Sequence, residues 1–282
     1  MRLREKFKLK IIDDGLLDRC GKIDSSYKFN ITIPELRIKD SKIVGNPDDK
    51  FETFLFLPEG EGRKGEGGLR AKGYFRFSYV KHNGEWWIAD YEENLLKPAP
   101  EEIQEAITDY MNTLPAEIHP SFSKLPLITV ITVVLNGEKY LEQTIQSVIN
   151  QTYPNVEYII VDGGSEDGTL DIIREYEDHI DYWVSEKDKG IYDAMNKGTN
   201  LATGFWIYYL GCGDRLIEPK VIQKVIQDIL EREFVFGKLI VFPIKLDSKS
   251  RISYPNLSGT VPIIHHQSCL FNLASLKDLQ LY

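Results

Sequence analysis

The sequence predicts an α/β fold with a mostly parallel sheet and flanking helices, preceded by a smaller β-rich domain. From Leu127 onward, apolar strand patterns alternate with helical patterns, which is typical of a parallel sheet covered on both faces. Residues 1 to about 123 instead carry short alternating runs that are typical of half-buried strands. We therefore expect a β-rich domain over residues 1–123, ending in a helix and a linker, and an α/β domain over residues 124–282.

Composition and charge argue against several classes of protein. The 282 residues are 42% hydrophobic and 27% charged, as in globular proteins. A net charge of -9 argues against a nucleic-acid partner, since phosphate backbones select basic surfaces. The three cysteines, Cys20, Cys212 and Cys269, are odd in number and far apart, so we expect a reducing cytoplasm rather than a disulfide framework or a zinc site. No apolar run reaches the roughly 18 residues of a membrane span.

Three alternating runs predict strands in the first domain: Tyr27–Ile33, Phe51–Leu57 and Tyr74–Val80. The third leads through Asn83-Gly84 into Trp86–Ile88, and Asn-Gly between two such runs is a strong hairpin signal. This part of the chain is therefore expected to contain at least one antiparallel hairpin.

The remaining segments of the first domain carry weaker signals. Glu59–Gly73 contains six glycines among charges but lacks the pattern of a phosphate-binding loop, so we expect a flexible hairpin loop. Trp86 and Trp87 are expected to pack in the small domain, with sugar stacking the less favoured alternative. Acidic residues in its first turn favour a helix over Glu101–Leu114, and His119–Lys124 is the expected linker.

In the second domain, polar residues follow each predicted strand. Leu127–Val134 is a β-branched run typical of a strand buried on both sides, and Leu135-Asn136-Gly137-Glu138 follows it. Tyr158–Val161 is the next buried strand and ends at Asp162, whereas Phe205–Leu210 is followed by Gly211-Cys212-Gly213-Asp214. Open α/β sheets bind ligands at the carboxyl ends of their strands, so we expect these loops to form a site.

Two motifs between these strands carry a family resemblance. The first helix ends in Ser147-Val148-Ile149-Asn150-Gln151-Thr152, and the second strand runs into Val161-Asp162-Gly163-Gly164-Ser165-Glu166-Asp167-Gly168-Thr169. These segments match the S-x-x-x-Q-[ST] and V-D-[DG]-G-S-x-D-G-T patterns of family 2 glycosyltransferases. From about Pro126 to Tyr282 the chain therefore resembles these inverting enzymes, in the branch that makes bacterial surface polysaccharide. The resemblance implies a GT-A-type, Rossmann-like sheet.

The resemblance also implies where a nucleotide binds. In the family, the first loop and the aspartate of the second loop hold the nucleobase and ribose. The segment Ser185–Gly198 matches a further part that approaches the sugar-diphosphate. Carried onto this sequence, the implied nucleotide-binding residues are Val133, Asn136, Asp162, Asp188 and Lys189. For Lys189, a solvated charge run is an equally good interpretation.

A divalent metal, Mg²⁺ or Mn²⁺, is implied as well, because the family has a D-x-D-type motif after the third of these strands. Here only Asp214 keeps a carboxylate, and Cys212 is a poor ligand for a hard ion. Asp214 is therefore the metal candidate. In Ile263–Phe271, His266 is a second candidate for the metal or the diphosphate, with a structural role as the equal alternative.

The implied function is an inverting glycosyltransferase that moves a sugar from a nucleotide-diphospho-sugar, with UDP favoured, to a glycan or lipid-linked acceptor. The setting would be cell-surface polysaccharide synthesis in the cytoplasm, with room for peripheral association at the inner face of the membrane. The family's catalytic base lies in an acidic motif that is not matched before Tyr282. We therefore expect a C-terminally truncated domain and leave the catalytic residue unassigned.

Other functions fit less of the pattern. The reduced metal motif and the unmatched base also suit a non-catalytic nucleotide-sugar-binding or scaffolding protein. A sugar nucleotidyltransferase shares the general fold but needs a glycine-rich, Arg/Lys-bearing phosphate loop, which LNGEKYL after the first strand does not supply. A dehydrogenase is disfavoured because no G-x-G-x-x-G follows that strand.

Overall fold

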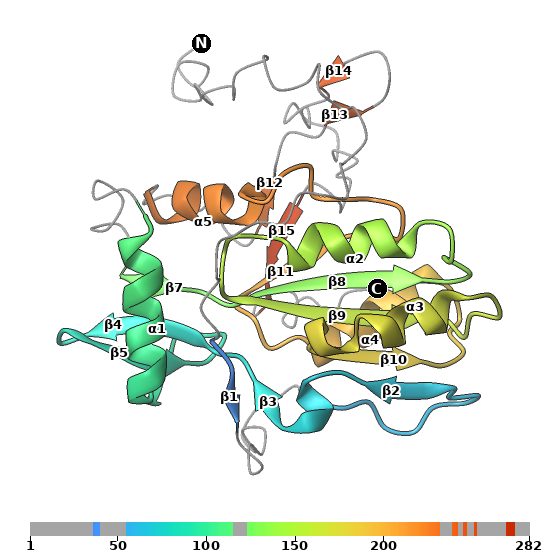
Figure 1. Cartoon of the computed structure of the whole chain (residues 1–282), viewed down its shortest axis with the longest axis horizontal. Coiled ribbons are helices and arrows are strands. Elements are labelled where there is room, and N and C mark those ends of the chain that lie inside the picture. Colours follow the sequence, from blue (N-terminus) through green and yellow to red (C-terminus); the bar gives the residue numbers. More distant parts are fainter. Residues whose placement is uncertain are drawn as a thin grey trace, which may run out of the picture. The chain divides into compact units, whose positions relative to one another are not determined.

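The computed structural model describes residues 36–39, 55–114, 123–231, 239–241, 245–246, 251–252 and 269–273. These residues are drawn in colour in Figure 1. All of them belong to the unit Ile33–Tyr282. No helix within these ranges is long and apolar enough to cross a membrane.

A seven-stranded sheet in the order β12–β15–β11–β8–β9–β10–β2 forms the centre of this unit. Its strands are β2 (Gly65–Gly67), β8 (Ile128–Val134), β9 (Val156–Asp162), β10 (Tyr182–Ser185), β11 (Trp206–Tyr209), β12 (Leu239–Val241) and β15 (Cys269–Asn272). The neighbours β11, β8, β9 and β10 are parallel, whereas β2, β15 and β12 pair antiparallel. This confirms the predicted mostly parallel sheet.

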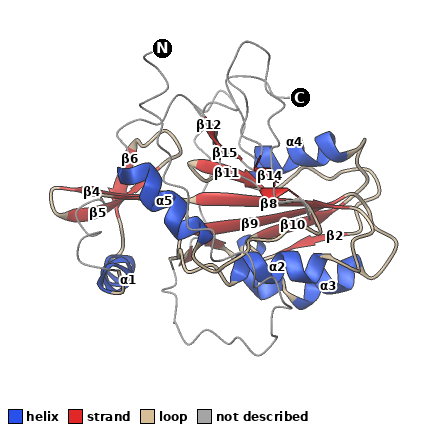
Figure 2. Ribbon diagram, turned by 90° about the horizontal axis from the view of Figure 1, so that it is seen from above, coloured by secondary structure: helices blue, strands red, loops and turns tan. Residues whose placement is uncertain are grey.

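Helices cover both faces of this sheet (Figure 2). Helices α2 (Leu141–Ile149) and α3 (Thr169–Glu175) lie on one face, and α4 (Ile191–Leu201) lies on the other. Side chains alternate along each strand, so Val130 packs in the same cluster as Ile145 of α2, while its neighbour Ile131 packs with Met195 of α4. Because both faces are covered, β8 is buried along almost its whole length.

A second sheet of four antiparallel strands precedes this architecture, in the order β6–β5–β4–β7. Its elements are β4 (Ser78–His82), β5 (Glu85–Ala89), β6 (Leu95–Pro98) and β7 (Lys124–Leu125), with helix α1 (Glu101–Asn112) nearby. The predicted hairpin is confirmed: Asn83 and Gly84 have φ of 51° and 90°, as a two-residue hairpin turn requires. Trp86 is buried in the core with α1, whereas Trp87 is half-buried beside the His82 ring.

The remaining elements are short, except for helix α5. They are β1 (Ile38–Lys39), which pairs with β3 (Tyr74–Phe75), β13 (Lys245–Leu246), which pairs with β14 (Arg251–Ile252), the 3₁₀ turns η2 (Arg70–Lys72) and η4 (Glu177–His179), and α5 (Val221–Glu231). Strand β2 comes from the predicted N-terminal domain and β7 from the start of the second one, yet each pairs with a strand from the other side of that boundary. The division between residues 123 and 124 stays a prediction.

The glycine-rich segment Glu59–Gly73 corrects one expectation. It is not a hairpin loop, because Gly65–Gly67 pair antiparallel with β10 as an edge strand of the central sheet. A Cβ atom at Gly67 would lie 2.7 Å from the indole nitrogen of Trp183 on β10. Glycine is needed here because the tryptophan lies against the strand.

Two further strand predictions need correction. Tyr74–Val80 is divided into β3 and β4, with Arg76 between them, where its guanidinium binds Asp181 and the carbonyl of Pro154. Of the predicted strand 51–57, residues 55–57 are not in a strand, and residues 51–54 lie outside the described ranges, as does the predicted strand 27–33. Sequence patterns did not predict β10, which is only four residues long.

Candidate functional site

Four loops meet at one edge of the central sheet, where the parallel strands β8, β9, β10 and β11 end. In the strand register, Val134 at the end of β8 is level with Asp162 at the end of β9, and Asp162 is level with Ser185 at the end of β10. This carboxyl edge is where open α/β sheets bind ligands. The predicted site residues that the structure describes all belong to this end of the sheet.

Asp162 is fully buried at the end of β9, with 0% of its surface exposed. Its carboxylate accepts hydrogen bonds from the backbone N–H groups of Gly164 (3.3 Å) and Ser165 (3.0 Å). The hydroxyls of Ser165 and Ser185 also donate to it, the latter at 2.5 Å. These bonds fold the turn back over the strand end, with Gly164 at a φ of 87° that suits glycine. The carboxylate therefore organises the loop from within.

Asn136 joins the β8 loop to the β9 loop. Its side-chain oxygen accepts the N–H of Glu166 at 2.9 Å, and its own N–H donates to the hydroxyl of Ser165 at 2.6 Å. Asn136 has a φ of 52°, a left-handed conformation that asparagine tolerates better than most residues. The β8 and β9 loops are thus one hydrogen-bonded unit. Val133 is half-buried in β8, just before the first of these loops.

Asp188 and Lys189 lie in the loop between β10 and α4. A Cβ atom at Gly163 would collide with the Asp188 carboxylate, so this side chain lies directly against the β9 loop. The same carboxylate accepts the N–H of Gly190 at 2.8 Å. The Lys189 side chain is exposed, while its backbone N–H donates to Asp193 at 3.1 Å. The structure thus brings Asp188 to the Asp162 loop and leaves the Lys189 side chain at the surface.

Sequence patterns missed an ion-pair cluster behind this loop. The Glu186 side chain is 5% exposed and lies between Arg63 Nη2 (2.6 Å) and Lys197 Nζ (2.7 Å). Burial alone would raise the pKa of Glu186, but the hydrogen bonds and charges of Lys197 and Arg63 outweigh burial and hold this pKa below its ordinary value. Arg63 is 123 residues away in the sequence, so no local pattern indicates the contact.

Asp214 follows β11 in a loop that helix α2 holds in place. The Thr144 hydroxyl donates to the carbonyl oxygen of Asp214 at 2.8 Å and accepts the N–H of Gly213 at 3.0 Å. Gly213 has a φ of 97°, which glycine adopts without strain. The Asp214 residue itself is half-buried at the carboxyl edge.

The residues near Asp214 limit what this loop can bind. Burial first, and then the carboxylates of Asp167 and Asp214, raise the pKa of the Cys212 thiol to about 11, so the thiol is neutral at ordinary pH. No group of three or more His, Cys, Asp or Glu side chains in the described ranges is arranged to hold a metal, and His266 lies outside those ranges. Mg²⁺ is commonly held by one or two carboxylates together with substrate phosphates, so Asp214 fits a metal that arrives with a diphosphate.

The side chains of the S-x-x-x-Q-T motif form hydrogen bonds with backbone groups of the protein itself. The Gln151 side chain donates to the carbonyl oxygens of Ser147 (3.0 Å) and Glu218 (2.8 Å). Its oxygen accepts the N–H of Ile222 at 3.1 Å, and the Ser147 hydroxyl accepts the N–H of Leu216 at 3.1 Å. The motif therefore fastens the end of α2 to the segment between β11 and α5, which holds the β11 loop in place.

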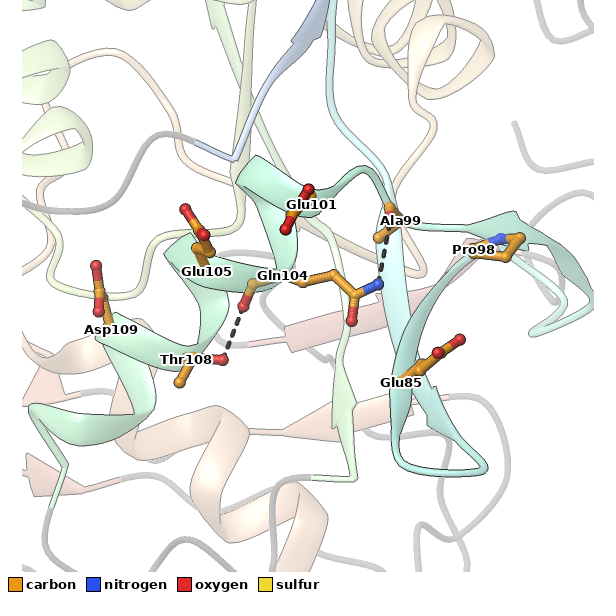
Figure 3. A pocket seen from close by; sticks show the side chains of 8 residues that line it. All are labelled: Glu85, Pro98, Ala99, Glu101, Gln104, Glu105, Thr108 and Asp109. Carbon is orange, nitrogen blue, oxygen red and sulfur yellow. Dashed lines mark hydrogen bonds between the residues drawn. The ribbon is translucent and has the colours of Figure 1, made fainter.

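A separate hollow of about 780 Å³ lies beside α1 (Figure 3). Four of its eight lining residues are acidic; all eight are Glu85, Pro98, Ala99, Glu101, Gln104, Glu105, Thr108 and Asp109. The Gln104 amide donates to the carbonyl oxygen of Ala99 at 3.1 Å and accepts the N–H of Trp86 at 3.2 Å. None of the lining residues belongs to the four loops, so this hollow is distinct from the candidate site.

Comparison with known families decides the assignment. Residues 129–273, just over half of the 282-residue chain, match the family model described as Glycosyl transferase family 2. The chain belongs to glycosyl transferase family 2. This confirms the predicted resemblance, and the sheet with its flanking helices confirms the predicted fold class. The matched range includes every residue predicted for the site.

Several relatives carry glycosyltransferase names. The chain is 36% identical over 122 residues to a PGL/p-HBAD biosynthesis glycosyltransferase of Mycobacterium bovis (strain BCG / Pasteur 1173P2), covering 41% of this chain and 48% of the relative. It is also 36% identical over 115 residues to the putative teichuronic acid biosynthesis glycosyltransferase TuaG of Bacillus subtilis (strain 168), covering 40% of this chain and 45% of TuaG. The chain thus spans about half the length of the curated relatives it matches.

Solved structures resemble part of the fold. S. aureus TarS 1-349 in complex with UDP has a TM-score of 0.45 and 19% identity, covering 55% of this chain and 49% of that one. The mannosyltransferase PcManGT from Pyrobaculum calidifontis, in complex with GDP-Man and Mn²⁺, has a TM-score of 0.45 and 19% identity, covering 56% and 47%. At these scores the likeness says nothing about the ligand of this chain.

Proposed function

We propose that this chain carries the donor-binding part of an inverting glycosyltransferase, which moves a sugar from a nucleotide-diphospho-sugar to a glycan or lipid-linked acceptor. The observation that carries the proposal is the meeting of four loops at the carboxyl edge of the sheet, in a chain of family 2. A UDP-sugar is the favoured donor. Cell-surface polysaccharide synthesis at the cytoplasmic face of the membrane is the proposed setting, in line with the biosynthetic name of TuaG.

The proposed nucleotide contacts are Val133, Asn136, Asp162, Asp188 and Lys189. Hydroxyl groups rotate to suit their partners, so the Ser185 hydroxyl can turn away from Asp162 and leave one acceptor position for an N–H of the nucleobase. The same carboxylate oxygen keeps its bonds to the N–H groups of Gly164 and Ser165. The exposed ammonium of Lys189 suits the charge of the diphosphate.

Asp214 is the proposed protein ligand of a divalent cation, with His266 as the second candidate. Such a cation neutralises charge on the leaving diphosphate. The part played by this chain is to hold the Asp214 loop at the edge of the sheet, through the Thr144 hydroxyl and the Gly213 turn.

Inverting transfer also needs a base. It takes the proton from the acceptor hydroxyl while that oxygen attacks the anomeric carbon and the bond to the diphosphate breaks. We assign this role to none of the described residues, and the role of the N-terminal sheet is likewise unassigned.

Non-catalytic binding of a nucleotide-sugar, as in a scaffolding protein, is the second candidate. The observation that favours it is the Cys212 thiol, which is neutral at ordinary pH and occupies part of the loop that carries the metal motif in the family. A neutral thiol is a poor ligand for a hard cation, so metal binding would depend on Asp214 and on the phosphates of the nucleotide.

Calorimetric titration of UDP and GDP, with and without Mn²⁺, tests both candidates. We expect one nucleotide to bind, more tightly with Mn²⁺, and Asp214→Asn to abolish the effect of the metal. Asp171→Asn is the matched control, because this carboxylate is 87% exposed on α3. Release of UDP from UDP-sugars by the full-length protein would favour the enzyme, whereas binding without turnover would favour the scaffold. Absence of binding under every condition would contradict both.

A further inference from the structure

The segment that precedes the family region reaches the candidate nucleotide loops from outside. Strand β2 lies along β10 at the edge of the sheet (Figure 1), and just before it the N–H of Lys64 donates to the carbonyl oxygen of Ser185 at 2.8 Å. Ser185 is the last residue of β10 and one of the groups that hold Asp162. Residues 57–67 lie well outside the family match at 129–273.

Lys64 holds the β9 loop by its carbonyl groups. Its ammonium donates to the carbonyl oxygens of Gly164 and Ser165, each at 3.0 Å. The N–H groups of the same two residues donate to Asp162. Asp162 therefore binds the N–H groups of this turn, and Lys64 binds its carbonyl groups. An ammonium offers only donors, so carbonyl oxygens are suitable partners for it.

Arg63 holds the neighbouring loop through Glu186. Two of its N–H groups donate to Glu186, at 2.6 and 3.0 Å. The other contacts of the guanidinium are the carbonyl oxygens of Leu57 (3.2 Å) and Pro58 (2.6 Å) and the carboxylate of Glu66 (3.0 Å). All five guanidinium donors are thus used, which fixes the side chain in one orientation.

The backbone of this segment also lies against Glu186. A Cβ atom at Gly60 would collide with the Glu186 carboxylate, and the N–H of Lys187 donates to the carbonyl oxygen of Glu61 at 3.3 Å. Glu186 and Lys187 directly precede Asp188, which lies against Gly163 of the β9 loop. The upstream segment therefore supports the start of the loop that carries Asp188.

We infer that Arg63 and Lys64 are positioning residues of the nucleotide site. Lys64 holds the Gly164–Ser165 turn, and Arg63 holds the Glu186 end of the β10–α4 loop. The inference rests on the proposed nucleotide site and extends it to a segment outside the family region. Both residues act through these loops, so their loss changes the affinity for the nucleotide without removing any contact assigned to it.

The test compares Lys64→Met with Lys72→Met in the full chain. Lys72 on η2 also precedes the family region, but it pairs with Asp178 on η4 at 2.6 Å, which is not part of the four loops. Hydrogen–deuterium exchange over residues 162–169 and titration of UDP with Mn²⁺ are the two readouts. In Lys64→Met we expect faster exchange there and about tenfold weaker binding, equivalent to about 1.4 kcal/mol. Lys72→Met is expected to change neither.

Arg63 is tested by a graded pair. Arg63→Lys keeps a positive charge beside Glu186 but loses the forked donors, whereas Arg63→Met loses both. We expect exchange over residues 185–190 and the loss of UDP affinity to increase from the lysine to the methionine variant, with the melting temperature measured for each. Equal affinities in all four variants and the unmodified chain would overturn the inference.

Two other outcomes would also contradict the inference. Exchange that accelerates uniformly along the chain in Lys64→Met would indicate general destabilisation rather than positioning. Absence of UDP and GDP binding by the unmodified chain would overturn the proposed function and, with it, the nucleotide part of the inference. In that case, unchanged exchange over residues 162–169 in Lys64→Met would overturn the positioning role as well.

Discussion

Strand β9 carries two buried carboxylates that are held in different ways, Glu157 near its start and Asp162 at its end. Glu157 is 2% exposed and pairs with Arg70 at 2.6 Å. It also accepts hydrogen bonds from the hydroxyls of Thr129 (2.5 Å) and Thr203 (2.6 Å). Asp162 is 0% exposed, and it accepts hydrogen bonds from two backbone amides and two hydroxyls. Among the described contacts, one carboxylate is paired with a cation and the other is held by neutral groups.

This difference in partners distinguishes Glu157, which supports the fold, from Asp162, which belongs to the candidate site. A buried carboxylate is costly unless it is paired or well hydrogen-bonded. At the start of β9 the cost is offset by a closed ion pair with Arg70, whose guanidinium also donates to the carbonyl oxygens of Leu55 and Leu201. At the end of β9 the described partners of Asp162 are neutral dipoles, so its negative charge can attract the N–H groups of a ligand. This is the electrostatic argument for the proposed contact between Asp162 and a nucleobase.

Arg70→Met is expected to have the largest effect on stability. It leaves Glu157 buried without its cation, which costs about 3–5 kcal/mol in comparable buried pairs. Urea unfolding of the full chain measures the loss. The double variant Arg70→Met/Glu157→Gln removes the unpaired charge and should recover a substantial part of it. A loss below about 1 kcal/mol, as for an exposed pair, would remove the contrast between the two ends of β9.

Asp162→Asn is expected to weaken both ligand binding and stability. The amide keeps the shape of the side chain but turns one acceptor into a donor, which faces the N–H groups of the turn. We expect a loss of about 1–3 kcal/mol in the free energy of unfolding and at least about tenfold weaker nucleotide binding. Glu157→Gln makes the same change on the same strand and should leave the affinity of the folded protein unaltered. Calorimetry that shows equal loss of affinity in both variants would contradict the comparison.

The parts of the fold that sequence patterns predict are those with strong local signals. Strand β8 is a continuous β-branched run, and the loop after β9 is a contiguous motif, so both could be recognised within a few residues. The predicted strand ends also place Asn136, Asp162 and Asp214 at one edge of the sheet, although their roles in binding stay predictions. His266 lies outside the described ranges.

The parts that sequence patterns miss depend on partners far along the chain. Strand β2 consists of Gly-Glu-Gly and has no apolar alternation; it is a strand because β10 offers a free edge and Trp183 leaves room for glycine alone. Arg63 lies in the segment expected to be a flexible hairpin loop, and no role is predicted for Glu186, since their pairing across 123 residues is visible only in three dimensions. Local propensity cannot predict contacts of this kind.

Ser185→Ala sharpens the comparison at the level of a single hydroxyl. It removes one neutral donor from Asp162, whereas Thr129→Val removes one from Glu157, and both bonds measure 2.5 Å. Thr129→Val also breaks the 2.9 Å bond that the Thr129 hydroxyl accepts from the N–H of Gly204. Ser185→Ala should cost about 1 kcal/mol of stability, the usual net contribution of a hydrogen bond, and Thr129→Val should cost more because it breaks two bonds. Only Ser185→Ala should change nucleotide affinity. We expect binding about two- to fivefold tighter, because the Ser185 hydroxyl competes with the ligand for Asp162. Equal affinities in the two variants would mean that Asp162 stays closed when the nucleotide binds.

The smallest expected effect concerns the reactivity of Cys212, which reports on the charge of the same edge. Burial, followed by the carboxylates of Asp167 and Asp214, raises the pKa of this thiol to about 11. The thiolate is the reactive form, so alkylation should keep accelerating as the pH rises towards 11 instead of levelling off near about 8.5, as for a free cysteine. Mass spectrometry of the Cys212 peptide measures the rate.

Removing one negative charge from the edge should lower that pKa. Asp214→Asn is expected to speed alkylation at pH 8 about two- to threefold, since a pKa change of one unit corresponds to about tenfold in thiolate and only one of the two carboxylates is removed. Asp171→Asn on α3 is the control and should leave the rate unchanged. If the unmodified chain already levels off near pH 8.5, the carboxylates exert little field at this edge. Asp162 would then attract the N–H groups of a ligand only through direct hydrogen bonds, and not through a wider negative field at this edge.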